Sequence, residues 1–511
     1  MPDTNSDATD PQVPSHSAQH FSFGSTRHLL LVLAISVLLL VPCFWHAHIE
    51  AGDLGSHVYN AWLVQLVQQG RAPGVYVIWQ WDNLLFDLLL SFFAKAFGFT
   101  LAEKFSVSLC VLIFFWGLFL FMKSVSGRAP WLLSPCIGML SYSYIFHMGF
   151  MNYYLSLGLA CLGLSFVWPQ RKHGLIVGAL MLPLMYLAHP LGFLLFLGVA
   201  VYRLLWPRLP GWWKVLLPVA ALLILFDARW FVAHHRGYEV EWRETPLWQL
   251  NGADQFHVFG PRYLWFTYAM VLFFVAATAV PCWAESVRAR FWRDRIIILL
   301  LYLISFSATA ILPENLHMDP TAGWIGALVT RLTLVSAIFG FCWLATLVPR
   351  SWHLAFWLIC ATVFFTFVYQ DTAYLNRMEA NTRLVTEQLP FGTRTVSTVF
   401  APNDYRTIYL HIPDRACIGH CFLVSNYEPS ARQFRVRVRQ GSPVVTASQD
   451  DSEDMQSGTF DVEDVDLPLK QIYQCEAADL TKICIRDLNE GEKNGRLGYH
   501  PLSNPFFSQN P

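Results

Sequence analysis

Residues 29–45 read LLLVLAISVLLLVPCFW, an apolar run that follows Arg27 and His28 directly. An α-helix needs about 20 mostly apolar residues to cross the hydrocarbon core of a bilayer, so a run of this length is typical of a membrane span. No small-x-small cleavage site follows at once, and we interpret the run as an uncleaved first span rather than a signal peptide. The stretch therefore predicts an integral membrane protein.

The composition of the whole chain supports this prediction. Of 511 residues, 54% are hydrophobic and 14% are charged, which is too apolar for an ordinary soluble protein. The formal net charge is -1, and neither a long Lys/Arg run nor a zinc-finger spacing is present. We therefore expect the lipid bilayer as a partner and no nucleic acid.

Further apolar segments of spanning length follow along the chain. They lie near residues 105–122, 131–147, 150–168, 174–188, 190–206, 214–232, 263–281, 295–312, 324–347 and 352–370. With the first run they predict about eleven transmembrane helices. The expected fold is an all-α polytopic membrane domain followed by a small soluble α+β domain.

Cationic residues fall at alternate connections between these segments. They are Arg27, Lys123, Arg128, Arg171, Lys172, Arg203, Arg208, Lys214, the run from Arg288 to Arg295, and Arg350. Positive charge marks the cytoplasmic side, so the N-terminus is expected in the cytoplasm, and an odd number of spans places the C-terminus outside. The general character of the chain predicts the inner membrane of a bacterium, with the C-terminal domain in the periplasm.

Whether the segment Asn83–Gly98 crosses the membrane decides whether the number of spans is odd. It would be about 24 Å long as a helix, and Asp87, Ser91 and Lys95 form one polar stripe along it. We predict a helix lying along the outer interface of the membrane. A short tilted span is the alternative, and it would require another segment to be re-entrant.

The chain divides into three parts. Residues 1–26 are polar and lack apolar periodicity, so they are predicted to be a disordered cytoplasmic tail. Residues 27–370 form the membrane domain, with residues 46–104 as the first outer loop, and residues 371–511 form the soluble domain.

Strand patterns appear in the soluble part. QFRVRVRQ, residues 433–440, alternates apolar and cationic side chains like a half-buried strand. TVSTVF, TIYLHI and CFLVSNY are predicted as further strands, and the acidic run 449–468 is predicted as a mobile, solvated loop. This run lacks the EF-hand order of calcium ligands, so a solvated loop is favoured over a calcium site.

Cysteine usage agrees with an outside location of the soluble part. Seven of the eleven cysteines lie in or beside membrane segments. The other four, Cys417, Cys421, Cys475 and Cys484, allow three pairings, among which we favour the local pairs Cys417 with Cys421 and Cys475 with Cys484.

The first outer loop is the part of the chain richest in ionisable residues. Residues 48–70, HIEAGDLGSHVYNAWLVQLVQQG, place acidic and histidine residues just after the first span and before an amphipathic helix. This arrangement resembles the GT-C class of polytopic membrane glycosyltransferases, although no subfamily is indicated. The resemblance implies transfer of a sugar from a polyprenyl-phosphate-linked donor to a glycan, lipid or protein acceptor on the outer face.

Asp53 matches the acidic residue that acts as general base or metal ligand in that class. A carboxylate within reach of an acceptor hydroxyl can take its proton, and the alternative is that Asp53 only caps the helix starting near Leu54. His57 would lie on the same helical face and could orient Asp53 or contact a donor phosphate, and Glu50 is the alternative acid. His48, Glu50, Asp53 and His57 lack a metal-ligand spacing, so no metal is predicted, although some members of the class use a divalent ion.

Other candidate residues lie in outer connections. His147 and Asn152 belong to SYSYIFHMGFMNYYLSLG, a Tyr-rich turn that could stack on sugar rings or only form an aromatic belt. His189 lies at a tight turn before Pro190, where it could be a site residue or a turn residue. Arg331, predicted about 10 Å inside the membrane, could bind the donor phosphate with two hydrogen bonds or pair with a carboxylate such as Asp227.

Acidic and histidine residues of later outer loops could hold the acceptor or could be merely solvated. They are Glu239, Glu241, Asp254, Glu314, His317 and Asp319. A non-catalytic assembly or binding protein and a lipid or solute transporter remain the alternative functions. A transporter predicts several deep ionisable residues and an inverted repeat, and the sequence has one such arginine and no repeat.

Overall fold

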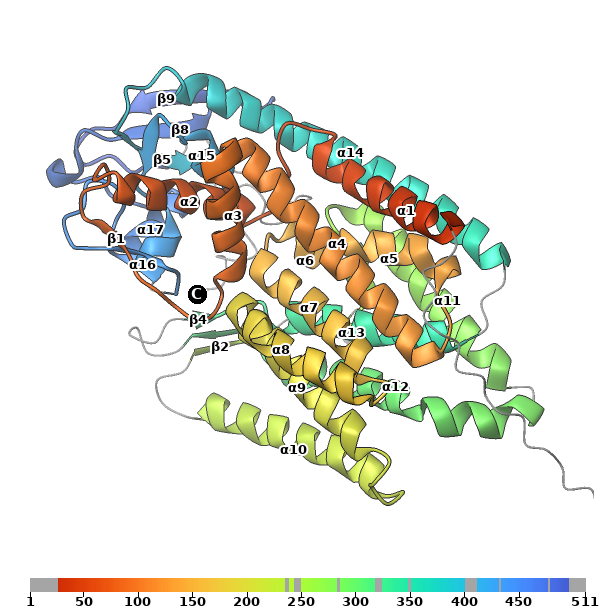
Figure 1. Ribbon diagram of the computed structural model, residues 1–511. Helices are drawn as coiled ribbons and strands as arrows, with labels where there is room; N and C mark the ends of the chain where they lie inside the picture. Colours follow the sequence, from red (N-terminus) through yellow and green to blue (C-terminus); the bar gives the residue numbers. More distant parts are fainter. Residues whose placement is uncertain are drawn as a thin grey trace, which may run out of the picture.

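The computed structural model describes residues 26–234, 239–242, 250–282, 285–317, 324–347, 351–399, 411–431, 433–476 and 478–495. Most of the chain is helical, with a small sheet region near the C-terminus. Figure 1 shows long helices side by side, with the C-terminal strands gathered at one end of the bundle, which we call the domain end. The predicted tail, residues 1–26, lies outside the described residues except for Thr26, which begins the first helix.

Among the described residues, six helices are long and apolar enough to cross a membrane. Five of them are α1 (Thr26–Phe44), α4 (Phe99–Ser126), α10 (Trp213–His234), α13 (Leu328–Thr346) and α14 (Ser351–Thr386), and the sixth is Pro261–Ala279, which contains most of α11 (Leu264–Cys282). Shorter apolar helices are α7 (Met151–Val167), α8 (Lys172–Ala188), α9 (Pro190–Leu205) and the part Arg295–Ile311 of α12 (Glu285–Ile311). These helices are compatible with a membrane protein, and the count of eleven spans stays a prediction.

Residues 131–147, predicted as one span, do not form a continuous helix. They divide into a 3-10 turn η1 (Trp131–Leu133), helix α5 (Ser134–Ser141) and the single turn α6 (Tyr144–His147). The chain leaves the helical conformation at Tyr142, and the Ser143 side chain accepts a hydrogen bond from the Phe146 amide to begin α6. At 1.5 Å per residue the eight residues of α5 cover only about 12 Å.

Helices α4 and α7 cross closely at the centre of the bundle because both carry glycine there. A Cβ atom at Gly117 would lie 2.4 Å from the carbonyl oxygen of Gly158, so the two backbones are in direct contact, as small residues allow in membrane helices. Large apolar side chains cover the outside instead: Leu38, Leu180, Leu272 and Ile359 are each about two thirds exposed or more. This is the distribution expected for a surface in lipid.

The C-terminal domain contains a four-stranded sheet in the order β6-β5-β8-β9. Its strands are β5 (Thr393–Thr398), β6 (Cys421–Leu423), β8 (Lys470–Gln474) and β9 (Ile483–Asp487). Strand β5 runs parallel to β6 and β8, and β9 is antiparallel to β8. Helices α15 (Ile412–Ala416), α16 (Tyr427–Ala431) and α17 (Gln449–Ser457) complete the domain.

Two of the predictions for this domain change. The acidic run 449–468 begins as helix α17, capped by the Ser448 side chain, because a serine cap and acidic residues in the first turn favour a helix start. Strand β7 (Val436–Val438) is present within QFRVRVRQ but pairs with β1 (Val75–Val77) of the first loop. The predicted strand TIYLHI lies mostly outside the described residues, and its last residues begin α15.

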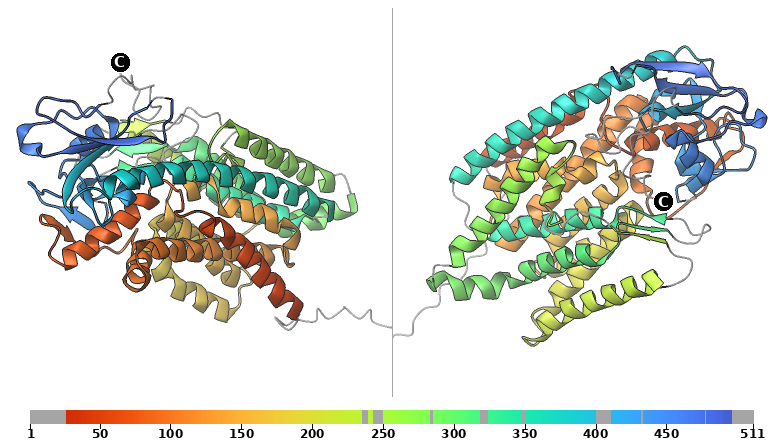
Figure 2. Two further views of the ribbon diagram at one scale, coloured as in Figure 1. Left: turned by 90° about the horizontal axis from the view of Figure 1, so that it is seen from above. Right: turned by 180° about the vertical axis from the view of Figure 1, so that it is seen from behind.

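Loops and domain interlock at the domain end. Helix α2 (Leu54–Gln68) is buried along most of its length, and helix α3 (Leu85–Phe97) stands beside it (Figure 1). A further small sheet joins β2 (Glu239–Glu241), β3 (Asn315–His317) and β4 (Trp324–Ile325). Figure 2 shows α14 running along the bundle up to the C-terminal domain, so the predicted boundary at residue 370 falls inside this helix.

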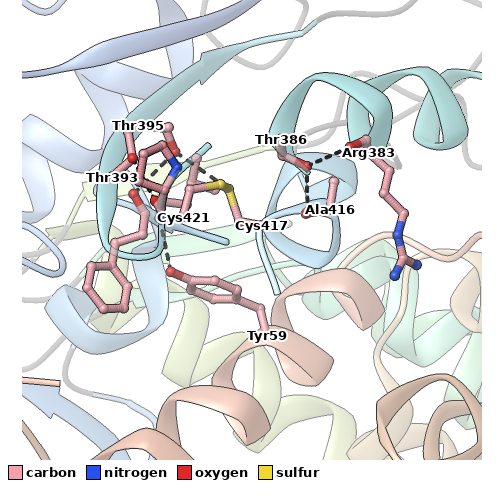
Figure 3. Close-up of a disulfide and its surroundings, with 11 residues drawn as sticks. Tyr59, Arg383, Thr386, Thr393, Thr395, Ala416, Cys417 and Cys421 are labelled. Carbon is pink, nitrogen blue, oxygen red and sulfur yellow. Dashed lines mark hydrogen bonds between the residues drawn. A yellow bond between two sulfur atoms is a disulfide. The ribbon is translucent and has the colours of Figure 1, made fainter. Parts of the chain in front are cut away.

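Both favoured disulfides are confirmed: Cys417 pairs with Cys421, and Cys475 pairs with Cys484. The first pair lies between α15 and β6 and faces the first loop (Figure 3), where the Leu423 amide donates a 2.9 Å hydrogen bond to the Tyr59 hydroxyl of α2. This disulfide therefore closes the short connection between α15 and β6, and α2 packs against that part of the domain.

Candidate functional site

Asp53 lies at the start of α2, and its backbone is fixed by the turn after α6. The Gly52 amide donates to the His147 carbonyl at 2.8 Å, and the Asp53 amide donates to the Met148 carbonyl at 3.0 Å. Asp53 occupies the N-cap position as predicted, but its side chain makes no capping hydrogen bond. The carboxylate is thus left available for other contacts.

Those contacts come from the C-terminal domain. Oδ1 of Asp53 lies 3.6 Å from Nε2 of His411, and the Asp53 side chain is 28% exposed while that of His411 is 7% exposed. On its other side, Nδ1 of His411 lies 3.2 Å from Oδ2 of Asp414. Nδ2 of Asn426 donates to Oδ1 of the same Asp414 at 2.6 Å. The four residues form a row that ends at the partly open carboxylate of Asp53.

His57 lies one turn further along α2 and is held between two carboxylates. Its Nδ1 is 3.0 Å from Oδ1 of Asp87 and 3.6 Å from Oε1 of Glu428. Burial alone would lower the pKa of His57, but Asp87 and Glu428 outweigh it and raise the pKa to about 9. Burial raises the pKa of Glu428 to about 7, against the opposing effect of His57. His57 is therefore a charged, enclosed residue that shapes the field around Asp53.

Asn152 supports this arrangement from α7. Its Nδ2 donates to Oδ2 of Asp87 at 2.9 Å, and its Oδ1 accepts from the Phe86 amide at 2.8 Å. Arg435 reaches α3 from the C-terminal domain and donates to the Asp87 carbonyl and to the Ser91 hydroxyl. The predicted polar stripe of α3 is thus used for contacts with protein groups, and Asn152 positions Asp87 rather than facing open space.

Arg331 faces the same region from α13. The helix begins at Leu328 after Ala327 in a left-handed conformation, so Arg331 lies in its first turn. The predicted span began earlier, at residue 324, and the depth of about 10 Å inside the membrane stays a prediction. The guanidinium carbon lies 4.5 Å from the ring centroid of Phe150. Nε of Arg331 is buried without a hydrogen-bond partner, and the guanidinium interacts electrostatically with Asp53 and Glu314.

His189 lies near this arginine but is bound to its own turn. Its Nδ1 accepts a hydrogen bond from the Leu191 amide at 3.2 Å, which caps α9, and its ring packs edge-on against Tyr153 with centroids 5.3 Å apart. Burial and Arg331 lower the pKa of His189 to about 3. The side chain is therefore a neutral imidazole beside Arg331.

Glu50 belongs to a second buried cluster that sequence reasoning missed. Nη2 of Arg415 lies 3.1 Å from Oε2 of Glu50, and Nη1 lies 3.0 Å from Oε2 of Glu103. Arg415 also binds Glu379 of α14 through Nε and Nη2, and His48 lies 3.5 Å from Glu379. Burial, Glu379 and Glu103 raise the pKa of Glu50 despite Arg415. The geometry favours a structural role for Glu50.

The Tyr-rich turn, for which sugar stacking and an aromatic belt were both open, is buried inside the protein. Tyr142, Tyr144, Tyr153 and Tyr154 are all buried, because the turn is covered by the first loop and by η3 (Ala253–Phe256), where Oε1 of Gln255 accepts from the Ile145 amide. His147 is buried with them, and burial lowers its pKa to about 4 despite its contact with the Glu50 carbonyl. These side chains form core rather than a sugar-binding surface.

The remaining loop candidates do not converge on Asp53 as a group. Glu314 accepts from the Thr330 hydroxyl, Asn315 donates to Glu241, and Asp254 accepts from the Gly252 amide. Asp319 and the side chains of Glu239 and His317 lie outside the described residues. In the described part of the chain, no group of three or more metal-ligating side chains is present.

His411, Asp414, Arg415 and Glu428 were not predicted as site residues. The only local indication is the charged run HIPDR, residues 411–415, inside an otherwise apolar stretch. Nothing in the sequence shows that this run meets a loop more than 350 positions earlier.

Comparison of the chain with protein-family models, with curated proteins and with solved structures finds no match.

Proposed function

We propose that this protein is a membrane glycosyltransferase that uses a lipid-phosphate-linked sugar and acts at the domain end of the bundle. The observation that carries the proposal is the partly exposed Asp53 carboxylate, which is free of any capping bond and lies close enough to the Arg331 guanidinium for the two charges to influence each other. A base and a cationic group that can bind phosphate, placed near each other, are what sugar transfer from a phosphate requires. The GT-C-like arrangement of the first loop supports the same class.

In the proposed reaction, the acceptor hydroxyl attacks the anomeric carbon of the donor sugar. The acceptor O–H bond breaks and its proton passes to Asp53, while a bond forms between the acceptor oxygen and the anomeric carbon. The bond from the anomeric carbon to the phosphate oxygen breaks, and the lipid phosphate leaves with the electron pair. Arg331 stabilises the charge on that phosphate with its guanidinium.

The test is mass profiling of glycans, glycoproteins and polyprenyl-linked sugars in cells with the wild-type gene, a deletion, or Asp53→Asn at matched membrane abundance. We expect the deletion and Asp53→Asn to lose the same sugar and to accumulate its lipid-linked donor. A general base contributes about 100-fold or more to rate, so the loss should be nearly complete. Asp82→Asn, in the same loop, is the matched control and should resemble wild type.

A non-catalytic binding or assembly protein is the second candidate. It is favoured by the extent to which charged and polar groups of the first loop are already paired with the C-terminal domain, as in the contacts of Arg415 with Glu50 and of Ser56 with Glu428. Full sugar transfer by well-expressed Asp53→Asn protein would exclude the catalytic proposal. A phenotype of the deletion that Asp53→Asn does not share would then favour this second function.

A further inference from the structure

The C-terminal domain meets the start of α2 by backbone contact, with His411 at the point of closest approach. A Cβ atom on Gly55 would lie 2.1 Å from the His411 carbonyl oxygen, so only glycine allows this approach. The His411 ring is also packed against Tyr427, with centroids 5.2 Å apart. The imidazole is therefore fixed in orientation, with one ring nitrogen toward each part of the protein.

The two ring nitrogens of His411 face two different carboxylates. Nδ1 faces Asp414 of α15 at 3.2 Å, and Nε2 faces Asp53 of the first loop at 3.6 Å. A neutral imidazole carries one N–H, and only the imidazolium can offer a proton to both sides. The contact with Asp53 is of ion-pair length, and such contacts often tighten only when substrate is bound.

The carboxylates that face His411 favour its protonated form. They are Asp53 at the start of α2, Asp414 on α15 and Glu428 on α16, while Tyr427 of α16 faces the ring as a packing partner. Burial lowers the pKa of His411, but the hydrogen bond and charge of Asp414, with Asp53 and Glu428, outweigh burial and raise it. The ring thus keeps its proton to a higher pH than an exposed histidine does.

Asp414 is itself held in place by a neighbouring side chain of the C-terminal domain. Its side chain is 1% exposed, and its second oxygen accepts the 2.6 Å hydrogen bond from Asn426. Asn426 in turn receives a hydrogen bond from Asn60 of α2 at 3.3 Å. The C-terminal domain therefore fixes Asp414, Asp414 fixes His411, and His411 faces the open carboxylate.

We propose that His411 is a positioning residue for Asp53, supplied by the C-terminal domain. Its imidazolium holds Oδ1 of Asp53 and leaves Oδ2 to take the proton of the acceptor hydroxyl. His411 keeps its own proton throughout, so the bonds made and broken are those of the transfer step above. This role rests on the proposed function, and it makes the soluble domain part of the catalytic unit.

The experiment measures the pH profile of sugar transfer in membranes that contain the full-length protein. The probe is the lipid-linked sugar fraction extracted from cells lacking the gene, where the donor is expected to accumulate, and the acceptor is that present in the same membranes. The variants are His411→Gln, which keeps a hydrogen-bond donor without the charge, Asp414→Asn, and Asp53→Asn. His420→Gln, a half-buried histidine of the same domain, is the matched control.

We expect His411→Gln to move the acidic limb of the profile upward by about one pH unit, because an imidazolium next to a carboxylate favours the charged carboxylate by about that amount or more. His420→Gln should leave the profile unchanged. Asp414→Asn should move the limb in the same direction by less, and it decides the question if His411→Gln protein does not accumulate.

The role of His411 is overturned if folded His411→Gln protein has an unchanged pH profile. If His411→Gln protein does not accumulate, an unchanged pH profile of Asp414→Asn protein overturns it. If Asp53→Asn is inactive in that case, the proposed function stands without it. Full activity of Asp53→Asn would instead remove the proposed function together with this inference. The two failures are therefore distinguishable.

Discussion

At the scale of single residues, the cost of burying charge decides what holds the domain end together. Arg415 contacts the buried carboxylates of Glu50, Glu103 and Glu379 together, and His48 adds contacts to Glu103 and Glu379. A buried charge that loses its partner is far more costly than an exposed one. Asp53 differs from these three residues because its carboxylate remains partly open to solvent.

Replacing Arg415 with methionine should destabilise the protein by about 3–5 kcal/mol, because three carboxylates would remain buried without their cation. The measurement is thermal unfolding of the detergent-solubilised protein. Arg383→Met is the matched control, since the ion pair of Arg383 with Glu387, just after α14, is nearly half exposed on both sides and such pairs contribute at most about 1 kcal/mol. Equal effects of the two substitutions would show that Arg415 is not the centre of this cluster.

At the scale of elements, α2 joins the bundle to the C-terminal domain. Its sequence is amphipathic, but the helix is buried nearly all round because the domain covers the face that the sequence leaves for solvent. Ser56 donates to Glu428 at 2.9 Å and Tyr59 accepts from the Leu423 amide at 2.9 Å. The position of Asp53 therefore depends on the docking of α2 as a unit.

Gly55→Ala should loosen this docking, because the added Cβ would overlap the His411 carbonyl. We expect faster limited proteolysis of the C-terminal domain and a loss of sugar transfer that parallels it. Gly198→Ala in α9 is the control, since a Cβ there meets open space, and alanine at such a position is neutral or slightly stabilising. Wild-type protease resistance of the Gly55→Ala protein would contradict the close approach.

At the scale of the whole molecule, the candidate site is assembled at one end of the bundle. Asp53 lies at the start of α2, His189 at the start of α9 and Arg331 in the first turn of α13. Figure 1 shows the C-terminal strands beside α2 at that end. The cationic connections, such as the one around Arg171, are expected on the opposite side of the membrane by the positive-inside rule.

Cysteine labelling tests this orientation. Glu490→Cys in the C-terminal domain should react with a membrane-impermeant maleimide in intact cells, and Lys172→Cys should react only after the membrane is opened. Both positions are exposed, so a difference in reaction reports their side of the membrane. The reverse result would place the C-terminal domain in the cytoplasm and would contradict the predicted topology.

Features that depend on local composition and periodicity could be predicted from the amino-acid sequence alone. Apolar runs indicated the helices, because each run must bury its backbone hydrogen bonds within itself in lipid. The start of α2 at Leu54, strand β5 and the two disulfides could be predicted from short patterns, and so could the place of Asp53 at a helix start. The broken segment 131–147 could not, because its turn depends on contacts with η3 and the first loop.

The side chains that surround Asp53 could be identified only from the three-dimensional fold. His411 and Asp53 are 358 positions apart in the chain (411 − 53), and neither composition nor spacing carries information about such a contact. The same holds for the three carboxylates around Arg415, which come from the first loop, α4 and α14. From the sequence alone, a single charged residue is expected to lie in solvent. Only the fold shows whether the residue is buried and therefore needs a partner of opposite charge.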